Sequence, residues 1–431
     1  MFPTSRSRRL RGFRALLLAP FLGVTPFGPY VEVPGERELS GWVIVRPLPL
    51  AALRGRGLDA AAAVSRRELA RQELATCGVD EYVAATDEYI VRVPAGETAN
   101  ELAARLQSLD LYQYAEPDWL LHPLGCPDDS RFDRQYHHDV TKLKSCSGWT
   151  IHAGLPSAGV GLCDTGVRTT HEDLQLHRRE GYNAVDRRWE SQDGDIGSIN
   201  VHGTLTTGCA AANGDNEIGV AGMGWNLSHR MLRVTNDPSG VARMSDIQHA
   251  ARTAIEAGDR VASVSYAGVE FLSNLSTATY IKSIGGLLVW GAGNSGDYSN
   301  FSPRDADDIL VVGATDEYDE HASFSVRGPF VDLVAPGVGV YTTGGTSDAA
   351  YGAGTGTSFS TPLVAGLCAL IFSAAPHLAP DEVELVLKVS CDDLGTPGVD
   401  NVFGYGRIDI YTAMLLVRGG GVPVGGRVPP K

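Results

Sequence analysis

The chain has 431 residues, of which 43% are hydrophobic and 20% are charged. This length suits one large domain and a small one, and the composition is ordinary for a soluble globular protein. The formal net charge of -15 at pH 7 argues against nucleic acids and anionic membrane surfaces as partners. No apolar run reaches the roughly 20 residues that a membrane-spanning helix needs.

The N-terminus is basic and is followed by a short apolar segment. Residues 1–14 contain only arginines as charged side chains, and residues 15–24 are apolar. This order is the pattern of a secretory signal peptide, so we predict that residues 1–39 form a leader and that the protein is secreted or exported. A disordered basic leader is the alternative, because Pro20 interrupts the apolar segment and no small-x-small cleavage site follows it.

Residues 40–122 predict a small separate domain. The expected strands lie at 42–45, 82–85, 89–93 and from Tyr112 onward, and the expected helices lie at 60–77 and around Leu102, Leu106 and Leu109. The resulting order of strand, helix, strand, strand, helix and strand is that of the ferredoxin-like α+β fold. This fold occurs with many functions and therefore indicates none by itself.

Residues 126–417 predict a larger α/β domain. Apolar strands are expected at 160–163, 231–234, 261–265, 287–290 and 309–312, and helices at 205–212, 245–257 and 363–372. Continuous apolar strands between helices indicate a parallel sheet that is covered by helices on both faces. Sites in such sheets lie beyond the carboxyl ends of the strands. The Gly- and Pro-rich tail, residues 418–431, is predicted to be disordered.

The seven cysteines predict buried thiols and leave room for one disulfide. Three of them lie within apolar strand or helix patterns, where free thiols are expected: Cys163, Cys209 and Cys368. Three others lie in more polar surroundings, where one bridge could form: Cys126, Cys146 and Cys391. The sequence has no CxxC motif or Cys/His cluster that would indicate zinc.

Four short motifs carry the groups that acyl-transfer chemistry needs. Asp164 ends a predicted strand, Asn294 follows another, and His202 and Ser358 each stand near the start of a predicted helix. All four can therefore meet at one edge of the sheet. There Ser358 would attack a carbonyl carbon, His202 would carry the proton, Asp164 would orient the imidazole, and Asn294 would stabilise the oxyanion.

In sequence and order these motifs resemble those of the subtilisin-like serine proteases, or subtilases. The matching stretches are Asp164-Thr165-Gly166, His202-Gly203-Thr204, Gly291-Ala292-Gly293-Asn294 and Gly356-Thr357-Ser358-Phe359-Ser360-Thr361-Pro362. Residues 129–136 resemble the mature N-terminus of thermitase-like members. The triplet at Asp164 also occurs in aspartic proteases, but that chemistry needs a second such Asp, and the sequence has no other Asp-Thr-Gly or Asp-Ser-Gly.

The resemblance implies a substrate groove and a role for the N-terminal domain. Residues 40–122 look like the family's propeptide, a folding chaperone and temporary inhibitor whose tail lies in the active site; a permanent accessory domain is the alternative. Substrate would pair with residues 263–268 as an added strand. The pocket for the residue before the scissile bond would be walled by Ser265, Tyr266, Ala267, Gly291, Ala292 and Gly293.

Some positions depart from the family pattern. Ala267 stands where many relatives have Gly, and Phe301 aligns near the floor of the pocket, so the pocket should be shallower. Pro303 matches a position that is cis in the family. The segment 205–207 reads Leu-Thr-Thr where relatives usually carry His-Val-Ala. That change alters the packing behind the general base and removes no catalytic group.

The resemblance also implies a structural calcium ion. Its ligands would be Asp129, Asp173, the side chain of Asn216 and loop carbonyls that include those of Ile218 and Val220. Hard oxygen ligands of this kind suit calcium. A solvated acidic loop is the alternative.

Together these features predict a secreted, monomeric serine endopeptidase that is made as a self-processing zymogen. Its partners would be polypeptide substrates and its own propeptide, with no nucleic acid and no membrane span. A catalytically silent binding protein with the subtilase fold is the alternative. The presence of all four catalytic groups argues against it, because a binding scaffold has no need of them.

Overall fold

The computed structural model describes residues 37–121, 126–301 and 308–419. The chain forms two compact units, Met1–Pro123 and Leu124–Lys431, which we call the N-terminal unit and the C-terminal unit and describe separately. Most of the predicted leader, most of the predicted tail and Pro303 lie outside the described residues.

The N-terminal unit is a small α+β domain. Its elements are β1 (Arg37–Pro47), α1 (Leu50–Gly55), α2 (Ala60–Cys77), β2 (Val79–Val83), β3 (Glu88–Arg92), α3 (Ala99–Ser108) and β4 (Tyr112–Leu121). The sheet has the order β2-β3-β1-β4, and every neighbouring pair is antiparallel. This arrangement confirms the predicted ferredoxin-like fold.

Local sequence explains where the two main helices of the N-terminal unit begin. The carboxylate of Asp59 accepts a hydrogen bond from the N–H of Ala62 at the start of α2. Thr98 and Glu101 form a reciprocal capping box at the start of α3. The short helix α1 was not predicted. The predicted strand at 82–85 was displaced, because β2 is a largely exposed edge strand with little apolar patterning.

The C-terminal unit is built on an eight-stranded sheet with the order β12-β11-β10-β9-β5-β8-β6-β7. The strands are β5 (Gly159–Asp164), β6 (Tyr182–Asn183), β7 (Arg188–Trp189), β8 (Ser228–Arg233), β9 (Val261–Val264), β10 (Leu287–Gly291), β11 (Ile309–Thr315) and β12 (Leu333–Pro336), with a separate pair β13 (Val340–Thr343) and β14 (Tyr351–Gly354). All neighbours in the large sheet are parallel except β6 and β7. The predicted parallel sheet is confirmed.

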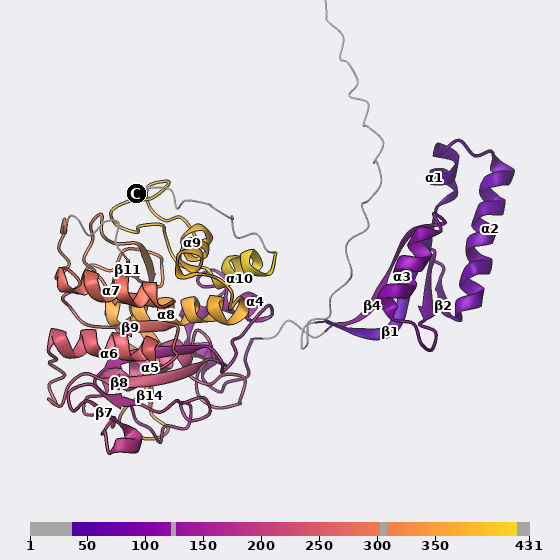
Figure 1. Ribbon diagram of the computed structural model, residues 1–431. Coiled ribbons are helices and arrows are strands. Elements are labelled where there is room, and N and C mark those ends of the chain that lie inside the picture. Colours follow the sequence, from indigo (N-terminus) through magenta and orange to yellow (C-terminus); the bar gives the residue numbers. More distant parts are fainter. Residues whose placement is uncertain (1–36, 122–125, 302–307, 420–431) are drawn as a thin grey trace, which may run out of the picture. The chain divides into compact units, whose positions relative to one another are not determined.

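Helices cover both faces of this sheet (Figure 1). They are α4 (Ser145–Trp149), α5 (His202–Ala211), α6 (Met244–Glu256), α7 (Ser273–Ser283), α8 (Thr357–Ala374), α9 (Pro380–Ser390) and α10 (Ile410–Arg418). Side chains of β10 show the two faces. Leu287 and Val289 pack in the core with α5 and α8, whereas Leu288 and Trp290 pack in the core with α6 and α7. Burial on both faces explains why the strands read as continuous apolar runs.

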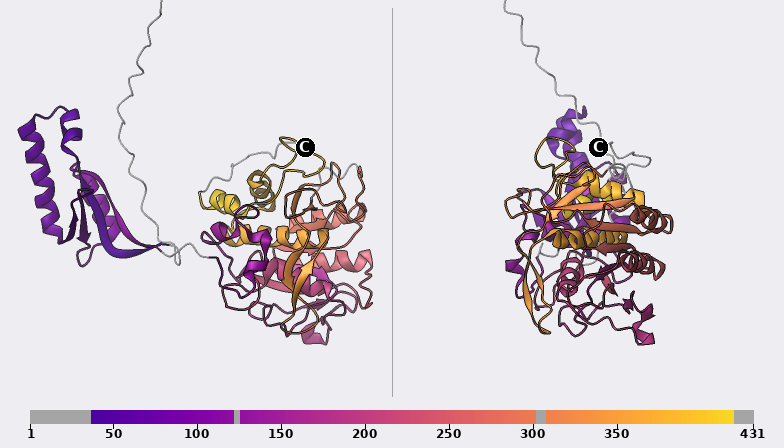
Figure 2. Two further views of the ribbon diagram at one scale, coloured as in Figure 1. Left: turned by 180° about the vertical axis from the view of Figure 1, so that it is seen from behind. Right: turned by 90° about the vertical axis from the view of Figure 1, so that its left-hand side faces the viewer.

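Helix α8 runs through the middle of the C-terminal unit, as both views of Figure 2 show. It is the one helix among the described residues that is long and apolar enough to cross a membrane, and 89% of it is buried inside the unit. It begins at Thr357, which corrects the predicted start at residue 363.

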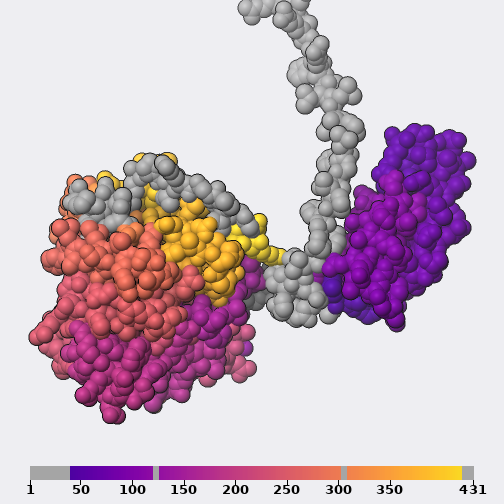
Figure 3. All heavy atoms as spheres, in the orientation of Figure 1, coloured from indigo at the N-terminus to yellow at the C-terminus, as the bar shows by residue number. Residues whose placement is uncertain are grey.

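In the space-filling view, the magenta segment with β6 and β7 adjoins the salmon segment with α6 and α7 (Figure 3).

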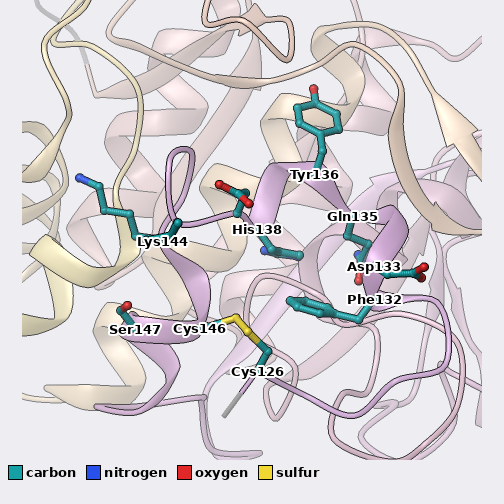
Figure 4. Close-up of a pocket in the computed structure, with 11 residues that line it drawn as sticks. Cys126, Phe132, Asp133, Gln135, Tyr136, His138, Lys144, Cys146 and Ser147 are labelled. Atoms are coloured by element: carbon teal, nitrogen blue, oxygen red, sulfur yellow. A yellow bond between two sulfur atoms is a disulfide. The ribbon is translucent and has the colours of Figure 1, made fainter. Parts of the chain in front are cut away.

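The cysteines follow the prediction. Cys126 and Cys146 form a disulfide, and Cys163, Cys209 and Cys368 are buried free thiols. Burial raises the pKa of the Cys209 thiol to about 12, so this group stays protonated and unreactive. Figure 4 shows the disulfide at one end of a pocket of about 310 Å³, which none of the predicted site residues lines.

Candidate active site

The structure brings the predicted catalytic residues to one edge of the large sheet. Asp164 is the last residue of β5, and Asn294 follows the end of β10. His202 is the first residue of α5, and Ser358 is the second residue of α8. Each group therefore extends from the end of a buried element, as the motifs predicted.

A close approach of two backbone segments lets His202 reach Asp164. The N–H of Gly203 donates to Oγ1 of Thr165 at 3.0 Å. A Cβ atom on Gly203 would lie 2.3 Å from the carbonyl oxygen of Gly166, which is far inside contact distance. Any residue larger than glycine would therefore move the start of α5 away from β5, and with it the imidazole.

Asp164 holds the imidazole through one of its oxygens. The carboxylate is 2% exposed, and its Oδ1 accepts from Nδ1 of His202 at 2.8 Å and from the N–H of Thr165 at 2.7 Å. A carboxylate can only accept, so Nδ1 carries the proton and Nε2 is left as the acceptor. This is the tautomer that a general base for Ser358 needs.

The electrostatics of His202 follow from the same contact. Burial acts to lower its pKa, but the negative charge and the hydrogen bond of Asp164 outweigh burial, so the pKa lies above the ordinary value of 6.5. The side chain keeps 29% of its surface exposed, which leaves one edge of the ring open to substrate. Asp164 thus favours the protonated form of this imidazole.

Ser358 is fixed by an exchange of hydrogen bonds with Ser265. Pro362 is the sixth residue of α8, so the helix lacks the N–H that would bond the carbonyl of Ser358. Oγ of Ser265 donates to that carbonyl at 3.0 Å instead. Oγ of Ser358 in turn donates to the carbonyl of Ser265 at 3.4 Å, and among the described residues no hydrogen bond joins it to His202.

Asn294 is oriented for donation of its amide. Its Oδ1 accepts from the N–H and from Oγ1 of Thr357, at 2.9 and 3.0 Å. A Cβ atom on Gly356 would lie 3.2 Å from Nδ2 of Asn294 and 3.7 Å from the backbone N of Ser358. The two candidate oxyanion donors thus border the same space, and Gly356, at φ +145°, leaves that space open.

A cavity of about 230 Å³ lies beside His202. Two of the predicted substrate-binding residues, Ser265 and Tyr266, line it, together with Thr165 of the Asp164 motif and with residues that the sequence did not single out: Asn200, Ser239 and Gly240. Oη of Tyr266 donates to the carbonyl of Gly240 at 2.9 Å, which closes one side. This contact could not be predicted from the sequence, because Ser239-Gly240 is an isolated pair of loop residues that forms no recognisable motif.

The other predicted substrate-binding residues flank these elements. Ala267 is exposed next to Tyr266. A Cβ atom on Gly291 would lie 3.0 Å from Oγ1 of Thr361, so β10 ends against the first turns of α8. Ala292 is buried, and Gly293 has φ +106°, which turns the chain toward Asn294. Phe301 packs with its ring centroid 4.5 Å from that of Phe330.

The predicted calcium ligands gather around the loop 214–220. Asp129 is 5% exposed and Asp173 is fully buried. Oδ2 of Asp129 accepts from the N–H of Asp215 and Oδ2 of Asp173 from the N–H of Val220, each at 2.8 Å. Nδ2 of Asn216 lies 3.4 Å from Oδ1 of Asp173. The N–H of Ile218 bonds Oδ1 of Asn216 at 2.8 Å.

These groups fit a cation. Burial raises the pKa of Asp129 to about 6 and that of Asp173 to about 8, and the charge of Asp129 adds to the shift of Asp173. Oδ1 of Asp129 is buried and has no partner among the described residues. Two buried carboxylates that repel each other would be stabilised by a bound positive ion. No group of three His, Cys, Asp or Glu side chains suited to a metal occurs in the described ranges.

Comparison with known proteins identifies the family. Residues 157–406 match the subtilase family. The thermophilic serine proteinase of Bacillus sp. (strain AK1) is 33% identical over 310 residues, which cover 72% of this chain and 74% of the relative. Thermitase of Thermoactinomyces vulgaris is 32% identical over 290 residues, which cover 67% and 99%.

A solved structure agrees with these relatives. A protease from Pseudoalteromonas arctica PAMC 21717 superposes with a TM-score of 0.59 at 26% identity, covering 68% of this chain and 100% of that one. The fold, the family match and the relatives agree on the same family. The chain belongs to the subtilase family and is a serine-type endopeptidase.

Proposed function

We propose that Asp164, His202 and Ser358 form the catalytic triad of this endopeptidase, with Asn294 and the backbone N–H of Ser358 as the oxyanion hole. The observation that carries the proposal is the 2.8 Å hydrogen bond from Nδ1 of His202 to the buried Asp164. It leaves Nε2 as the free base at the edge of the sheet where Ser358 begins α8.

The geometry supports a two-step reaction. The hydroxyl of Ser358 turns from the carbonyl of Ser265 to Nε2 of His202, gives up its proton, and attacks the carbonyl carbon of the scissile bond. The oxyanion accepts hydrogen bonds from Asn294 and from the N–H of Ser358. The imidazolium protonates the leaving amine, and the C–N bond breaks. Water, activated by His202, then hydrolyses the acyl-enzyme.

A serine-directed fluorophosphonate tests the triad and separates the enzyme from a catalytically silent binding protein. Wild type should take up one label on Ser358, and Ser358→Ala should take up none. Ser360→Ala is the matched control, because Ser360 is a buried serine of the same helix whose Oγ bonds the carbonyl of Ala335 at 3.0 Å. Absence of label on wild type would rule out the triad.

Polypeptide substrates would lie along residues 263–268. Within the described part of the chain, the carbonyl of Ser265 accepts a hydrogen bond only from the hydroxyl of Ser358, at 3.4 Å, so a substrate N–H can replace that contact. Such replacement frees Oγ of Ser358 to turn toward His202. The exposed Ala267, in place of a glycine, would make the adjoining pocket shallower than in relatives.

The N-terminal unit would act as the propeptide. Residues 112–121 form β4 and pair with β1, where Leu39 lies opposite Trp119. A tail that enters the active site therefore starts beyond Leu121, or the end of β4 first leaves β1. In the pairing of β1 with β4, a register shift between Leu39 and Val43 interrupts the regular strand pairing. The pairs at this end of β4 are therefore set apart from those that follow Val43.

The isolated segment 40–122 should inhibit the mature enzyme slowly and tightly, because its tail would occupy the substrate groove. Progress curves with a peptide substrate measure this. The matched comparison is segment 37–122, which keeps the strand partners of residues 119–121 and should inhibit less well. If neither segment inhibits the enzyme or helps it to refold, the propeptide assignment fails.

Secretion fits the chain's disulfide, since such bonds persist in oxidising compartments. One relative, from Natrialba magadii, is named a halolysin-like extracellular serine protease. We propose the same location for this protein, with residues 1–39 as the leader. Amino-terminal sequencing of the protein from the culture medium tests both.

Calcium would bind Asp129, Asp173, Asn216 and loop carbonyls and would supply positive charge between the two buried carboxylates. Binding to the folded state alone stabilises it by about 2.7 kcal/mol at a hundredfold excess over Kd. A chelator should therefore lower Tm by several degrees and speed autolysis. Asp173→Asn should reproduce part of the loss, and the exposed Asp193→Asn should not. Identical melting curves in calcium and in chelator would exclude the site.

A further inference from the structure

A second side chain of α5 contacts the catalytic carboxylate. Oγ1 of Thr206 donates to Oδ2 of Asp164 at 3.0 Å, and Thr206 is 1% exposed. Thr206 lies four residues after His202, so both side chains project from the same face of the helix. The helix therefore contacts both oxygens of Asp164, Oδ1 through the imidazole and Oδ2 through a hydroxyl.

The hydroxyl has a second acceptor, which is the weaker one. The carbonyl of Gly203 lies 3.2 Å from Oγ1 of Thr206, slightly farther than Asp164. Hydrogen bonds to an ionised acceptor are roughly twice as strong as those to a neutral one, so the single proton favours the carboxylate. Among the described residues Oδ2 of Asp164 has no other hydrogen-bond donor.

We propose that Thr206 is a positioning residue of the triad, which holds the plane of the Asp164 carboxylate and draws part of its negative charge away from His202. The proposal rests on the catalytic roles proposed above. It assigns a function to a position where the resemblance to the family implied a valine. A valine has the same shape as threonine and offers no donor.

Two consequences follow from removing this donor. Oδ2 would be left buried without a partner, and the carboxylate could rotate more freely about its terminal torsion. The full charge of the carboxylate would then act on the imidazolium. The pKa of His202, already raised by Asp164, would therefore rise further, and less of the imidazole would be the neutral base at neutral pH.

Among the described residues, Asp164 is the charged group that acts on His202. Arg233 of β8 lies opposite Asp164 in the sheet, but its guanidinium donates to the carbonyl of Thr235 and to Asp195. Two titratable groups also feel the charge of Asp164, Cys163 of β5 and Tyr266 after β9. Burial raises the pKa of both, so they stay neutral over an assay range of about pH 5 to 9. Helix α8 contributes the uncharged ring of Phe359, with its centroid 6.1 Å from that of His202.

The test compares three variants. Thr206→Val removes the donor and keeps the shape, and Thr206→Ser restores the hydroxyl. Thr207→Val is the matched control, because Thr207 is a fully buried neighbour on α5 whose hydroxyl donates to the carbonyl of Gly203 and, among the described residues, to no carboxylate. The measurements are the pH profile of kcat/KM, kcat and KM separately, Tm, and a titration of His202 by NMR in histidine-labelled protein.

In Thr206→Val the acidic limb of kcat/KM should move up by roughly half a unit to one unit. Below that limb, activity should fall about three- to tenfold through kcat, with KM unchanged. Thr206→Ser should return the acidic limb of kcat/KM toward its wild-type position. Thr207→Val should change Tm and leave the acidic limb in place. The NMR pKa of His202 should follow the kinetic limb.

The inference is overturned if His202 titrates identically in wild type and Thr206→Val, or if Thr207→Val produces the same shift. The NMR titration needs no turnover. The proposed triad would therefore be contradicted by a wild-type protein that neither cleaves peptides nor takes up fluorophosphonate. Even in that case, the titration of His202 would show whether Thr206 acts on the imidazole through Asp164.

Discussion

Ser358→Ala should lower peptide turnover by about a millionfold, the scale of loss known for the nucleophile of the related subtilisin. The loss should be this large because, in the proposed triad, Ser358 would form the covalent intermediate and His202 and Asp164 would act only through it. Burst kinetics with a chromogenic ester, together with turnover of a peptide, measure the effect. Residual activity within a hundredfold of wild type would mean that another group is the nucleophile.

The same variant also tests self-processing. If the enzyme cuts its own linker between the two units, purified full-length Ser358→Ala should remain intact, whereas wild type should give a shorter mature form. Electrophoresis and mass spectrometry of the N-terminus distinguish these outcomes and locate the cut. Normal maturation of the variant, with no other protease present, would contradict self-processing.

Asn294→Ala should lower kcat by roughly a hundred- to a thousandfold with little change in KM, a magnitude also carried over from a subtilisin. The amide Nδ2 borders the space beside Gly356, where negative charge would develop on the substrate oxygen only in the transition state. A ground-state contact would instead affect KM. Steady-state kinetics with one peptide substrate separate the two cases.

Further variants separate donation from orientation. Asn294→Asp keeps the acceptor that bonds Thr357 and replaces the donor by a negative charge, so it should lose at least as much kcat as Asn294→Ala. Thr357→Val removes one of the two contacts that orient the amide, and its loss should be much smaller. A change in KM alone for Asn294→Ala would place the oxyanion hole elsewhere.

The sequence predicted the elements whose pattern is set by burial on both sides. Strands β5 and β10 are fully buried, so their apolar runs could be recognised, and the polar residues at their ends marked the site. The start of α8 was missed because residues 356–362 are mostly small or polar and end in a proline, so that they resemble a loop. Contacts from distant residues hold them in helix: Asn294 bonds the N–H of Thr357, and Ser265 replaces the bond lost at Pro362.

Other features had no local signal. The two-residue strands β6 and β7 are too short for any periodicity. The hydroxyl of Thr206 could be noted as unusual, but its partner, Asp164, is 42 residues away in the chain. The contact between Tyr266 and Gly240 likewise depends on how two loops meet. Such contacts are decided by tertiary structure and have to be read from coordinates.

The disulfide has a consequence for how the two units could separate. All seven cysteines lie in the described residues, and the bond between Cys126 and Cys146 lies wholly within the C-terminal unit. Only the peptide chain therefore joins the units covalently. One cut in the linker would change their encounter from unimolecular to bimolecular, so the high effective concentration provided by the tether would vanish. If the N-terminal unit inhibits as proposed, dilution alone could then dissociate it, and the release of activity would depend on the enzyme concentration.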